Sequence, residues 1–401
     1  MARFDIARLD RISDWMQGYV DRKQYPGCSV LIAQGGTEVY YAQAGARDVA
    51  SGLPWQRDTV ARIFSMTKPV TSLALMLLVE RGQVHLDAPV SDFIPEFADA
   101  TCLVPDASDL SQTEPCAAPT LHQLLVHTSG LSYSFNPGPV PKAMQDGKLD
   151  FAPGARTLAD TAKELARLPL AFRPGTRWEY SVGIDIIGRV IEVISGQSLA
   201  EFLEKEIFDP LGMNETRFRV PSGVGDRFAS LYTPLAGEAF DLNAKSKGGE
   251  SLRRTDHADG SAYHTTNMQS GGGGLVGTIC DYLKFAEMLR TGGKELISPR
   301  TLSFMMRNHL AGDIASMGPA SFAEQPMDGM GFGIGGAVVL EPARARVPGS
   351  VGDFSWGGMA STFFWVDPVY DLSVLFFTQL APSSSYPSRS QLKALVHGAL
   401  K

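Results

Sequence analysis

Apolar residues near the start of the chain follow first a helical spacing and then a strand spacing. Residues 4–22 carry apolar side chains at helical intervals and are followed by Pro26, which predicts a helix that ends before the proline. The runs 28–33 and 39–42 are rich in β-branched and aromatic residues, and a Gly-Gly pair at 35–36 separates them. This pattern predicts an antiparallel hairpin.

The other end of the chain repeats the combination of strands and helix. Runs 362–366 and 372–378 bracket a turn at Asp367-Pro368, and an amphipathic helix is predicted over 388–400. Because both ends supply antiparallel strands and a helix, they most simply form one sheet that is layered with helices.

The middle of the chain has a helical pattern and few strand signals. Helices are predicted at 158–168, 184–194 and 199–208. The sequence therefore predicts two domains with a site between them. They are an α/β sheet domain made of residues 1–84 and 275–401, and a mainly helical inserted domain made of residues 85–274.

The composition is that of an ordinary globular protein, with 44% apolar and 20% charged residues in a chain of 401. A formal net charge of −7, without a cluster of lysine and arginine, argues against nucleic acid as a partner. The N-terminus lacks the apolar segment of a secretory signal, and the longest apolar run is shorter than a membrane span. We therefore expect a soluble, cytoplasmic protein that does not bind membranes, and its oligomeric state stays open.

The four cysteines show no C-x-x-C spacing and are few for this length. They are Cys28, Cys102, Cys116 and Cys280. This usage disfavours both a disulfide scaffold and a zinc site. Free thiols are expected, with a bridge between Cys102 and Cys116 left open.

The chemistry of the chain concentrates at Ser65-Met66-Thr67-Lys68, which precedes an apolar run over 70–79. Because a proline is tolerated only in the first turn of a helix, Pro69 predicts a helix start close to Ser65. Residues three apart share a helix face, which places Lys68 beside the Ser65 hydroxyl, where free N–H groups favour developing negative charge. The run is apolar nearly all round, so the helix is expected to be buried. A polar pair at its start indicates a serine nucleophile with its own lysine.

Tyr180 is the candidate third member of this group. It follows the turn Pro174-Gly175 and directly precedes a predicted helix, so its phenol is expected on a loop at a helix start. A free tyrosine is a poor base, but a neighbouring ammonium such as that of Lys68 favours the phenolate. Serine, lysine and tyrosine can then do together what Ser-His-Asp does in other hydrolases.

Two glycine-rich segments match nucleotide-binding motifs only in their letters. Residues 331–336 satisfy G-x-G-x-x-G, but a strand run follows where a phosphate site needs a helix start, so we expect a glycine-rich strand. Residues 271–274 lack the Lys-Ser/Thr of a P-loop and are interpreted as a turn or a wall of the site. No cofactor is expected.

The histidines give weaker signals. His127 suggests a Ser-His-Asp hydrolase, but no G-x-S-x-G elbow accompanies it, and a hydrogen-bonded histidine that shapes a turn is favoured. A polar loop holds four side chains that could bind a metal, but without the helical i,i+4 spacing of a metal site, so no metal is expected. They are Asp256, His257, Asp259 and His264.

Taken in order, these motifs resemble those of the serine β-lactamase and penicillin-binding-protein superfamily, and most closely those of class C-like β-lactamases and family VIII carboxylesterases. The resemblance covers most of the chain and rests on segments 65–68, 124–131, 180–182, 210–213, 272–275 and 356–358. It implies an α/β (α+β) fold of the β-lactamase/transpeptidase type, with an antiparallel sheet flanked by helices and a mainly helical domain.

The same resemblance implies the roles of the site residues. Ser65 is the acylated nucleophile, Lys68 its proton partner, and Tyr180 the base for acylation and for the deacylating water. The oxyanion hole consists of the backbone N–H groups of Ser65 and Met359, and Met359 follows the third motif on an edge strand. The residues expected to contact the substrate are Val182, Trp356, Gly357 and Gly358. If Tyr180 is not the base, His127 and His264 are the next candidates.

Two departures from the family pattern indicate small-molecule esters as substrates. Members that hydrolyse β-lactams usually carry Tyr-x-Asn and Lys-Thr-Gly, whereas Val182 and Trp356 stand at the corresponding positions here. Valine cannot hydrogen-bond a substrate amide, and tryptophan cannot pair with the β-lactam carboxylate. A tryptophan there is typical of the esterase branch and of a similar fungal acyltransferase. We therefore expect a serine hydrolase that cleaves short to medium acyl esters.

Other functions stay open at this point. A β-lactamase or an acyltransferase of the same family is the first alternative, with Arg253 or Arg254 as the cation that would restore carboxylate binding. A non-catalytic ligand-binding relative is the second, but such a protein has no need of an intact Ser65, Lys68 and Tyr180.

Overall fold

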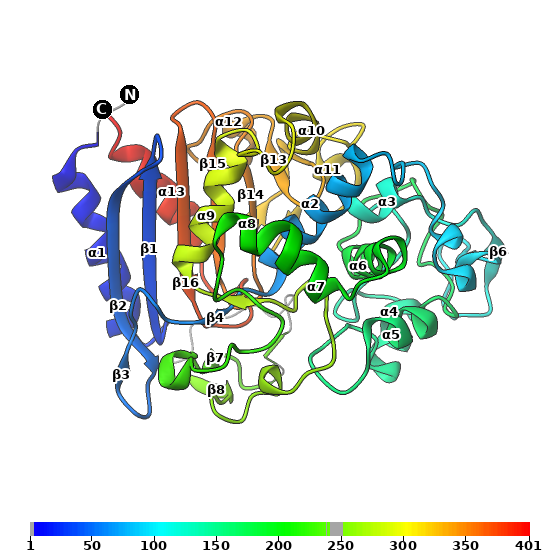
Figure 1. Ribbon diagram of the computed structural model, residues 1–401, viewed down its shortest axis with the longest axis horizontal. Helices are drawn as coiled ribbons and strands as arrows, with labels where there is room; N and C mark the ends of the chain where they lie inside the picture. Colours follow the sequence, from blue (N-terminus) through cyan, green and yellow to red (C-terminus); the bar gives the residue numbers. More distant parts are fainter. Residues whose placement is uncertain (1–3, 238, 241–251) are drawn as a thin grey trace.

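An eight-stranded antiparallel sheet lies at the centre of the computed structural model, which describes residues 4–237, 239–240 and 252–401 (Figure 1). In spatial order its strands are β12 (Met330–Phe332), β13 (Ala337–Val339), β14 (Phe354–Gly357), β15 (Phe363–Asp367), β16 (Leu372–Thr378), β1 (Gly27–Gln34), β2 (Thr37–Asp48) and β3 (Leu53–Pro54). β1 and β16 are neighbours, with Cys28 opposite Thr378 and Gln34 opposite Leu372. The two ends of the chain therefore build one sheet, as predicted.

Helices cover both faces of this sheet (Figure 1). α1 (Ile6–Asp21) and α13 (Ser388–Gly398) lie on one face, and α2 (Thr67–Glu80) and α9 (Ile279–Arg290) on the other. In β15, Phe363 and Trp365 pack with α1 and α13, whereas Phe364 and Val366 belong to the larger core around α2 and α9. Because successive strand residues point to opposite faces, a sheet covered on both sides needs continuous apolar strands.

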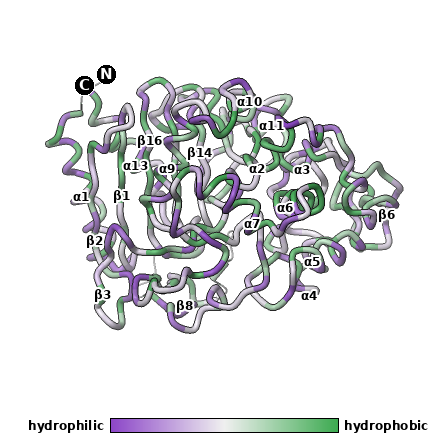
Figure 2. Tube along the Cα trace, viewed as in Figure 1, coloured by the Kyte–Doolittle hydropathy of each residue, from purple (hydrophilic) through white to green (hydrophobic). Residues whose placement is uncertain are grey.

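The middle of the chain is mainly helical. Its helices are α3 (Leu121–Leu125), α4 (Pro139–Gly147), α5 (Leu158–Leu165), α6 (Gly183–Ser195), α7 (Leu199–Leu203) and α8 (Asp209–Leu211), with a π-helical turn over Glu204–Phe208. α6 packs against α2, and its tube is largely green, which marks hydrophobic residues, in Figure 2. The division of the chain into two domains stays a prediction.

Short elements complete the described chain. The two-stranded pairs are β4 (Ala61–Arg62) with β9 (Val276–Gly277), β5 (Thr101–Leu103) with β6 (Thr113–Pro115), β7 (Leu231–Thr233) with β8 (Arg253–Asp256), and β10 (Ser321–Phe322) with β11 (Gln325–Pro326). The remaining α-helices are α10 (Pro299–Met305), α11 (Ile314–Met317) and α12 (Pro342–Ala345).

The elements predicted at both chain ends and the helices predicted in the middle are confirmed, with ends that differ by a few residues. One prediction differs in form, because the glycine-rich segment 331–336 is not a single strand. It turns between β12 and β13 at Gly335, whose φ is 85°. A Cβ at this position would lie 2.4 Å from the Ser72 Oγ, so the turn can approach α2 only because residue 335 is glycine.

The four cysteines are free thiols. Cys102 and Cys116 belong to the β5–β6 hairpin region, where Cys102 lies opposite Glu114. Among the described residues, no helix is both long and apolar enough to cross a membrane.

Candidate active site

Ser65 lies in a 3₁₀ turn, η1 (Phe64–Met66), that leads directly into α2. Phe64 has a φ of 43°, a left-handed conformation that costs energy for a residue with a side chain and that recurs at functional sites. Ser65 is partly accessible, whereas Lys68, one turn later, is fully buried. The Lys68 Nζ lies 3.4 Å from the Ser65 Oγ. The three-residue spacing therefore brings the two groups together, as the sequence predicts.

The Lys68 Nζ donates two further hydrogen bonds. One reaches the Tyr133 hydroxyl at 2.8 Å, and the other reaches the Gly272 carbonyl at 2.7 Å. An ammonium has three donors, so Ser65, Tyr133 and Gly272 use all of them. Gly272 and Gly273 line the cavity in front of Ser65, which confirms that the glycine run at 271–274 is a wall of the site.

Tyr180 lies on the loop directly before α6, as predicted, and is 5% exposed. Its ring centroid is 4.6 Å from the Lys68 Nζ, a cation–π contact, and Asn136 donates a hydrogen bond to its carbonyl at 3.0 Å. The hydrogen bond from Lys68 goes to Tyr133 instead. Sequence reasoning missed Tyr133, whose only signal is its place two residues after the segment 124–131.

His127 is a buried neighbour of this group rather than a member of a Ser-His-Asp triad. Its Nδ1 lies 3.0 Å from the Ser181 Oγ, and its φ of 58° places it in a turn. Burial, together with the charge of Lys68, lowers the pKa of His127 well below its usual value, so the imidazole is neutral. The second histidine candidate, His264, is bound to the Ala258 carbonyl at 2.7 Å.

The turn that follows β14 brings Met359 to Ser65. A Cβ on Gly358 would lie 2.3 Å from the Ile63 carbonyl oxygen, so only glycine permits this approach to the segment that precedes Ser65. Ser65 and Met359 both line the cavity. An oxyanion hole formed by their backbone N–H groups stays a prediction.

β14 itself is not an edge strand, and that sequence-based expectation is wrong. It pairs with β13 on one side and with β15 on the other. The pairing with β13 ends at Ser355, however, and Trp356 and Gly357 extend beyond it. Because β13 does not pair with Trp356 and Gly357, these two residues are open to the cavity on that side, as residues of an edge strand would be.

Aromatic side chains form much of the cavity, whose volume is about 350 Å³. The Trp356 ring stacks against Phe322 at 6.1 Å and lies 5.4 Å from the Tyr180 ring. Gly357 and Gly358 also line the cavity. All three residues therefore line the cavity, and their contact with a substrate stays a prediction.

Val182 does not fit the expected role in substrate binding. It is fully buried, lies at the start of α6, and is not among the described residues that line the cavity. Its N–H donates to the Ser132 carbonyl at 3.2 Å. Because Tyr180 stands two residues earlier on the cavity side, Val182 packs in the core behind it and cannot touch a ligand there.

Arg389 is a further residue of the cavity that sequence reasoning missed. It lies at the start of α13, is 9% exposed, and lines the cavity beside Gly357. Its Nη1 binds Glu324 at 2.8 Å and the Ala323 carbonyl at 3.1 Å. The arginines suggested by the sequence do not take this place, because Arg254 pairs with Asp48 and Arg253 binds carbonyls of the loop after β7.

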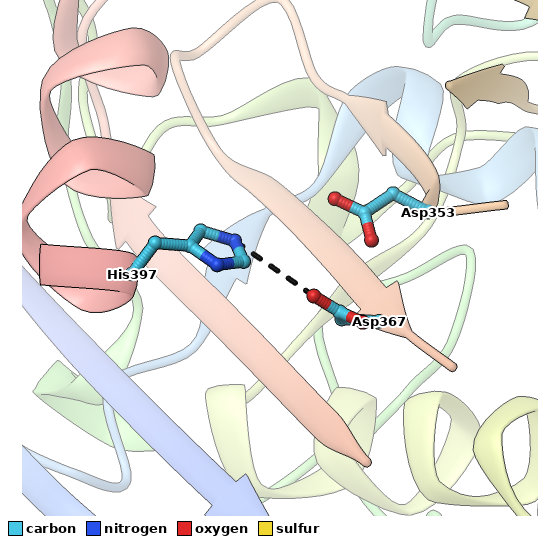
Figure 3. Close-up of side chains that lie close together, drawn as sticks. All are labelled: Asp353, Asp367 and His397. Carbon is cyan, nitrogen blue, oxygen red and sulfur yellow. Dashed lines mark ion pairs between the residues drawn. The ribbon is translucent and has the colours of Figure 1, made fainter. Parts of the chain in front are cut away.

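One group among the described residues has atoms close enough to share a metal ion, and it lies at the other end of α13. Its members are Asp353, Asp367 and His397, whose ligand atoms lie within 4.8 Å of one another (Figure 3). The Lys393 ammonium already donates to Asp353 at 3.1 Å, and the Ser350 hydroxyl donates to Asp367 at 2.8 Å. We therefore interpret the group as an ion-pair cluster that ties α13 to β14 and β15. The polar loop that was considered as a metal site in the sequence does not form such a group among the described residues. Its Asp256 instead pairs with the buried Arg62 at 2.6 Å.

The chain is similar to known proteins in sequence and in fold. The family model described as Beta-lactamase matches residues 12–398. The chain is 34% identical to the esterase EstB of Burkholderia gladioli over 94% of this chain and 90% of EstB. It is 30% identical to the lovastatin esterase of Penicillium rubens over 88% of each chain. The structure of EstCE1, described as a hydrolase with promiscuous acyltransferase activity, matches with a TM-score of 0.79 and 29% identity over 98% of each chain.

Proposed function

Since this chain belongs to the beta-lactamase family, we propose that it is a carboxylesterase of the family VIII type that cleaves short to medium acyl esters through an acyl-enzyme on Ser65. One observation carries the proposal. Ser65 and Lys68 face each other at 3.4 Å beside a cavity of about 350 Å³ whose walls are rich in aromatic residues. Esterase relatives that cover most of the chain support the same reaction class.

In the proposed acylation, the Ser65 Oγ attacks the ester carbonyl carbon while its proton passes to the Tyr180 oxygen. The Lys68 ammonium, 4.6 Å from the Tyr180 ring, stabilises the phenolate that accepts this proton. The backbone N–H groups of Ser65 and Met359 stabilise the oxyanion of the tetrahedral intermediate. The intermediate collapses when the C–O bond to the alcohol breaks and the alcohol takes the proton from Tyr180.

Deacylation repeats these steps with water in place of Ser65. Tyr180 takes a proton from the attacking water and returns it to the Ser65 Oγ when the carboxylic acid leaves. An alcohol that replaces this water gives acyl transfer, and the same residues serve both outcomes. The description of EstCE1 makes such transfer a reasonable side activity of this chain.

The cavity walls favour neutral esters over β-lactams. A β-lactam carries a carboxylate, and placing it against Trp356 without a partner costs free energy. The test compares kcat/KM for p-nitrophenyl butyrate and nitrocefin on one preparation. We expect the ester to be turned over far more efficiently; a nitrocefin value equal to the ester value would favour a β-lactamase.

The mechanism is tested by Ser65→Ala and by labelling with a fluorophosphonate. We expect the variant to lose ester hydrolysis by several orders of magnitude and the reagent to add its mass to Ser65. Ser72→Ala is the matched control, because Ser72 is buried on the same helix and its Oγ has no hydrogen-bond partner among the described residues. An active Ser65→Ala variant would exclude the acyl-enzyme mechanism.

A second candidate function rests on Arg389. Its guanidinium lines the cavity beside Gly357 and can pair with a carboxylate, which would restore some β-lactam binding. If it does, Arg389→Gln should lower kcat/KM for nitrocefin more than for p-nitrophenyl butyrate. An equal effect on both substrates would leave Arg389 with a structural role only.

A further inference from the structure

Asp185 is a buried carboxylate that the proposed reaction does not use. It lies in the first turn of α6 and is 1% exposed. Its Oδ1 accepts hydrogen bonds from the Ser270 hydroxyl and from the Gly272 N–H, the latter at 2.9 Å. Its Oδ2 has no hydrogen-bond partner among the described residues. Burial raises the pKa of Asp185 and the Lys68 charge opposes this rise, so the buried carboxylate depends on Lys68 to stay ionised.

Gly272 connects this carboxylate to Lys68. The Gly272 N–H binds Asp185, and the Gly272 carbonyl accepts a hydrogen bond from the Lys68 Nζ at 2.7 Å. A Cβ on Gly272 would lie 2.2 Å from the Asp185 Oδ2, so only glycine fits between the two side chains. Asp185 therefore fixes the carbonyl that Lys68 binds and places a negative charge behind it.

The other titratable groups around Lys68 are Tyr133, Tyr180, His127 and Asp150. His127 is neutral for the reasons given above. Burial raises the pKa of Tyr133 well above its usual value, and the Asp185 charge raises it further, so Tyr133 stays a neutral phenol. Asp150 acts on Tyr133 more weakly than Asp185 does and is bound to Ser134. Of these two carboxylates, Asp185 therefore acts more strongly on Tyr133.

We propose that Asp185 is a positioning residue for the esterase reaction, whose hydrogen bond fixes the Gly272 carbonyl for Lys68 and whose negative charge acts through Lys68 on the proton transfer from Ser65 to Tyr180. The inference rests on the proposed function, because it assigns Asp185 a role through Lys68 and not through the substrate.

Asp185→Asn tests this, because asparagine keeps the shape of the side chain and removes the charge. The measurement is kcat/KM for p-nitrophenyl butyrate between pH 5 and pH 10. We expect both limbs of the profile to move to lower pH by about one unit, as loss of a nearby unit charge in a protein interior requires. If Asp185 has only a structural role, the variant should be less active while both limbs of its pH profile stay where they are in the wild type. That result would overturn the proposal.

Asp150→Asn is the matched control, because it removes the same charge from a carboxylate with weaker influence. We expect a smaller shift of the pH profile, and equal shifts in the two variants would overturn the specific role of Asp185.

The rate at which a fluorophosphonate labels Ser65 should show the same pH shift without turnover. If the melting temperature shows that asparagine destabilises the fold, Asp185→Ser carries the same test with a smaller side chain. A wild type without hydrolysis or labelling would reject the proposed function, whereas an active wild type with an unshifted variant rejects only this inference.

Discussion

Lys68 has two tyrosine neighbours that contact it in different ways. Tyr133 accepts a hydrogen bond from its Nζ, whereas Tyr180 presents the face of its ring. Burial and the Asp185 carboxylate raise the pKa of Tyr133 well above its usual value, which opposes a phenolate at that position. This difference favours Tyr180 as the proposed base, and Tyr133 is suited to hold Lys68 in place.

This difference predicts different losses for the two phenylalanine variants. Tyr180→Phe removes the proposed base and should lower kcat for p-nitrophenyl butyrate by roughly 10²- to 10⁴-fold. Tyr133→Phe removes the acceptor of one hydrogen bond from the Lys68 ammonium and should lower kcat by roughly 10- to 100-fold, in line with the worth of a hydrogen bond to a charged group. Both melting temperatures serve as controls for folding. A larger loss for Tyr133→Phe would assign the base to Tyr133 instead.

For single residues, the sequence predicts only contacts between positions that are close together in the chain. Ser65 and Lys68 could be paired because three residues along a helix share a face, and Tyr180 could be placed because a turn and a helix start flank it. The contacts of Tyr133, Asp185 and Arg389 depend on which loops and helices pack together in the fold. The spacing of residues along the chain does not predict this packing. Val182 was misplaced for the same reason, since its neighbour Tyr180 shields it from the cavity.

The β10–β11 hairpin forms part of the cavity wall and depends on the C-terminal helix. Its two turn residues, Ala323 and Glu324, have φ values of 44° and 59°. A tight hairpin turn requires such positive values, which residues with side chains rarely adopt. Arg389 of α13 binds both of them, through the Ala323 carbonyl and the Glu324 carboxylate. The hairpin carries Phe322, which stacks on Trp356. α13 therefore fixes a wall of the cavity from outside it.

Glu324 makes this hairpin sensitive to pH. Burial raises its pKa from 4.5 to about 8. Because the folded-state pKa is raised, the contribution of Glu324 to stability is fully present below about pH 4.5 and is lost as the pH rises through about 8. The melting temperature of the wild type should therefore fall by a few degrees between pH 5 and pH 9.

Glu324→Gln should remove most of this fall, because glutamine cannot ionise. The measurement is the melting temperature of both proteins by calorimetry across that pH range. Glu295→Gln is the control, since Glu295 is exposed and its substitution should leave the pH dependence as in the wild type. A glutamine variant of Glu324 that loses stability with pH as steeply as the wild type would contradict the assignment.

Helices and strands could be predicted from the sequence where the spacing of apolar residues is strong and continuous. The terminal helices and the long strands β1 and β16 satisfy this, and they were predicted. Short elements were predicted less well: the strand run after the glycine-rich segment contains β13, whereas β10 and β11 were not predicted because they contain only two residues each. The interior position of β14 also escaped prediction, since its partner β13 is one of these short strands.

The catalytic cavity is a property of the whole molecule. Ser65 comes from the first part of the chain, Tyr133 and Tyr180 from the middle, and Trp356 and Arg389 from the last part. Because β1 and β16 are neighbours in one sheet, the first and last parts of the chain lie side by side, and the middle of the chain supplies the rest of the wall. The fold class could be predicted since it follows from patterns at both ends. The size of the cavity could not, because it depends on how three distant segments pack.

That size predicts how activity depends on the length of the acyl chain. A cavity of about 350 Å³ with aromatic walls gains from each buried methylene until it is full, at roughly 0.8 kcal/mol per methylene, and excludes longer chains. In a series of p-nitrophenyl esters from acetate to palmitate, kcat/KM should rise from acetate to a maximum at butyrate or hexanoate and then fall. Trp356→Ala should shift the maximum to longer chains, because it removes a large aromatic side chain beside the site. Phe304→Ala, which truncates an exposed aromatic residue on α10, is the control and should leave the maximum in place. A maximum that does not move in Trp356→Ala would show that the acyl chain lies elsewhere in the cavity and that Trp356 faces the alcohol instead.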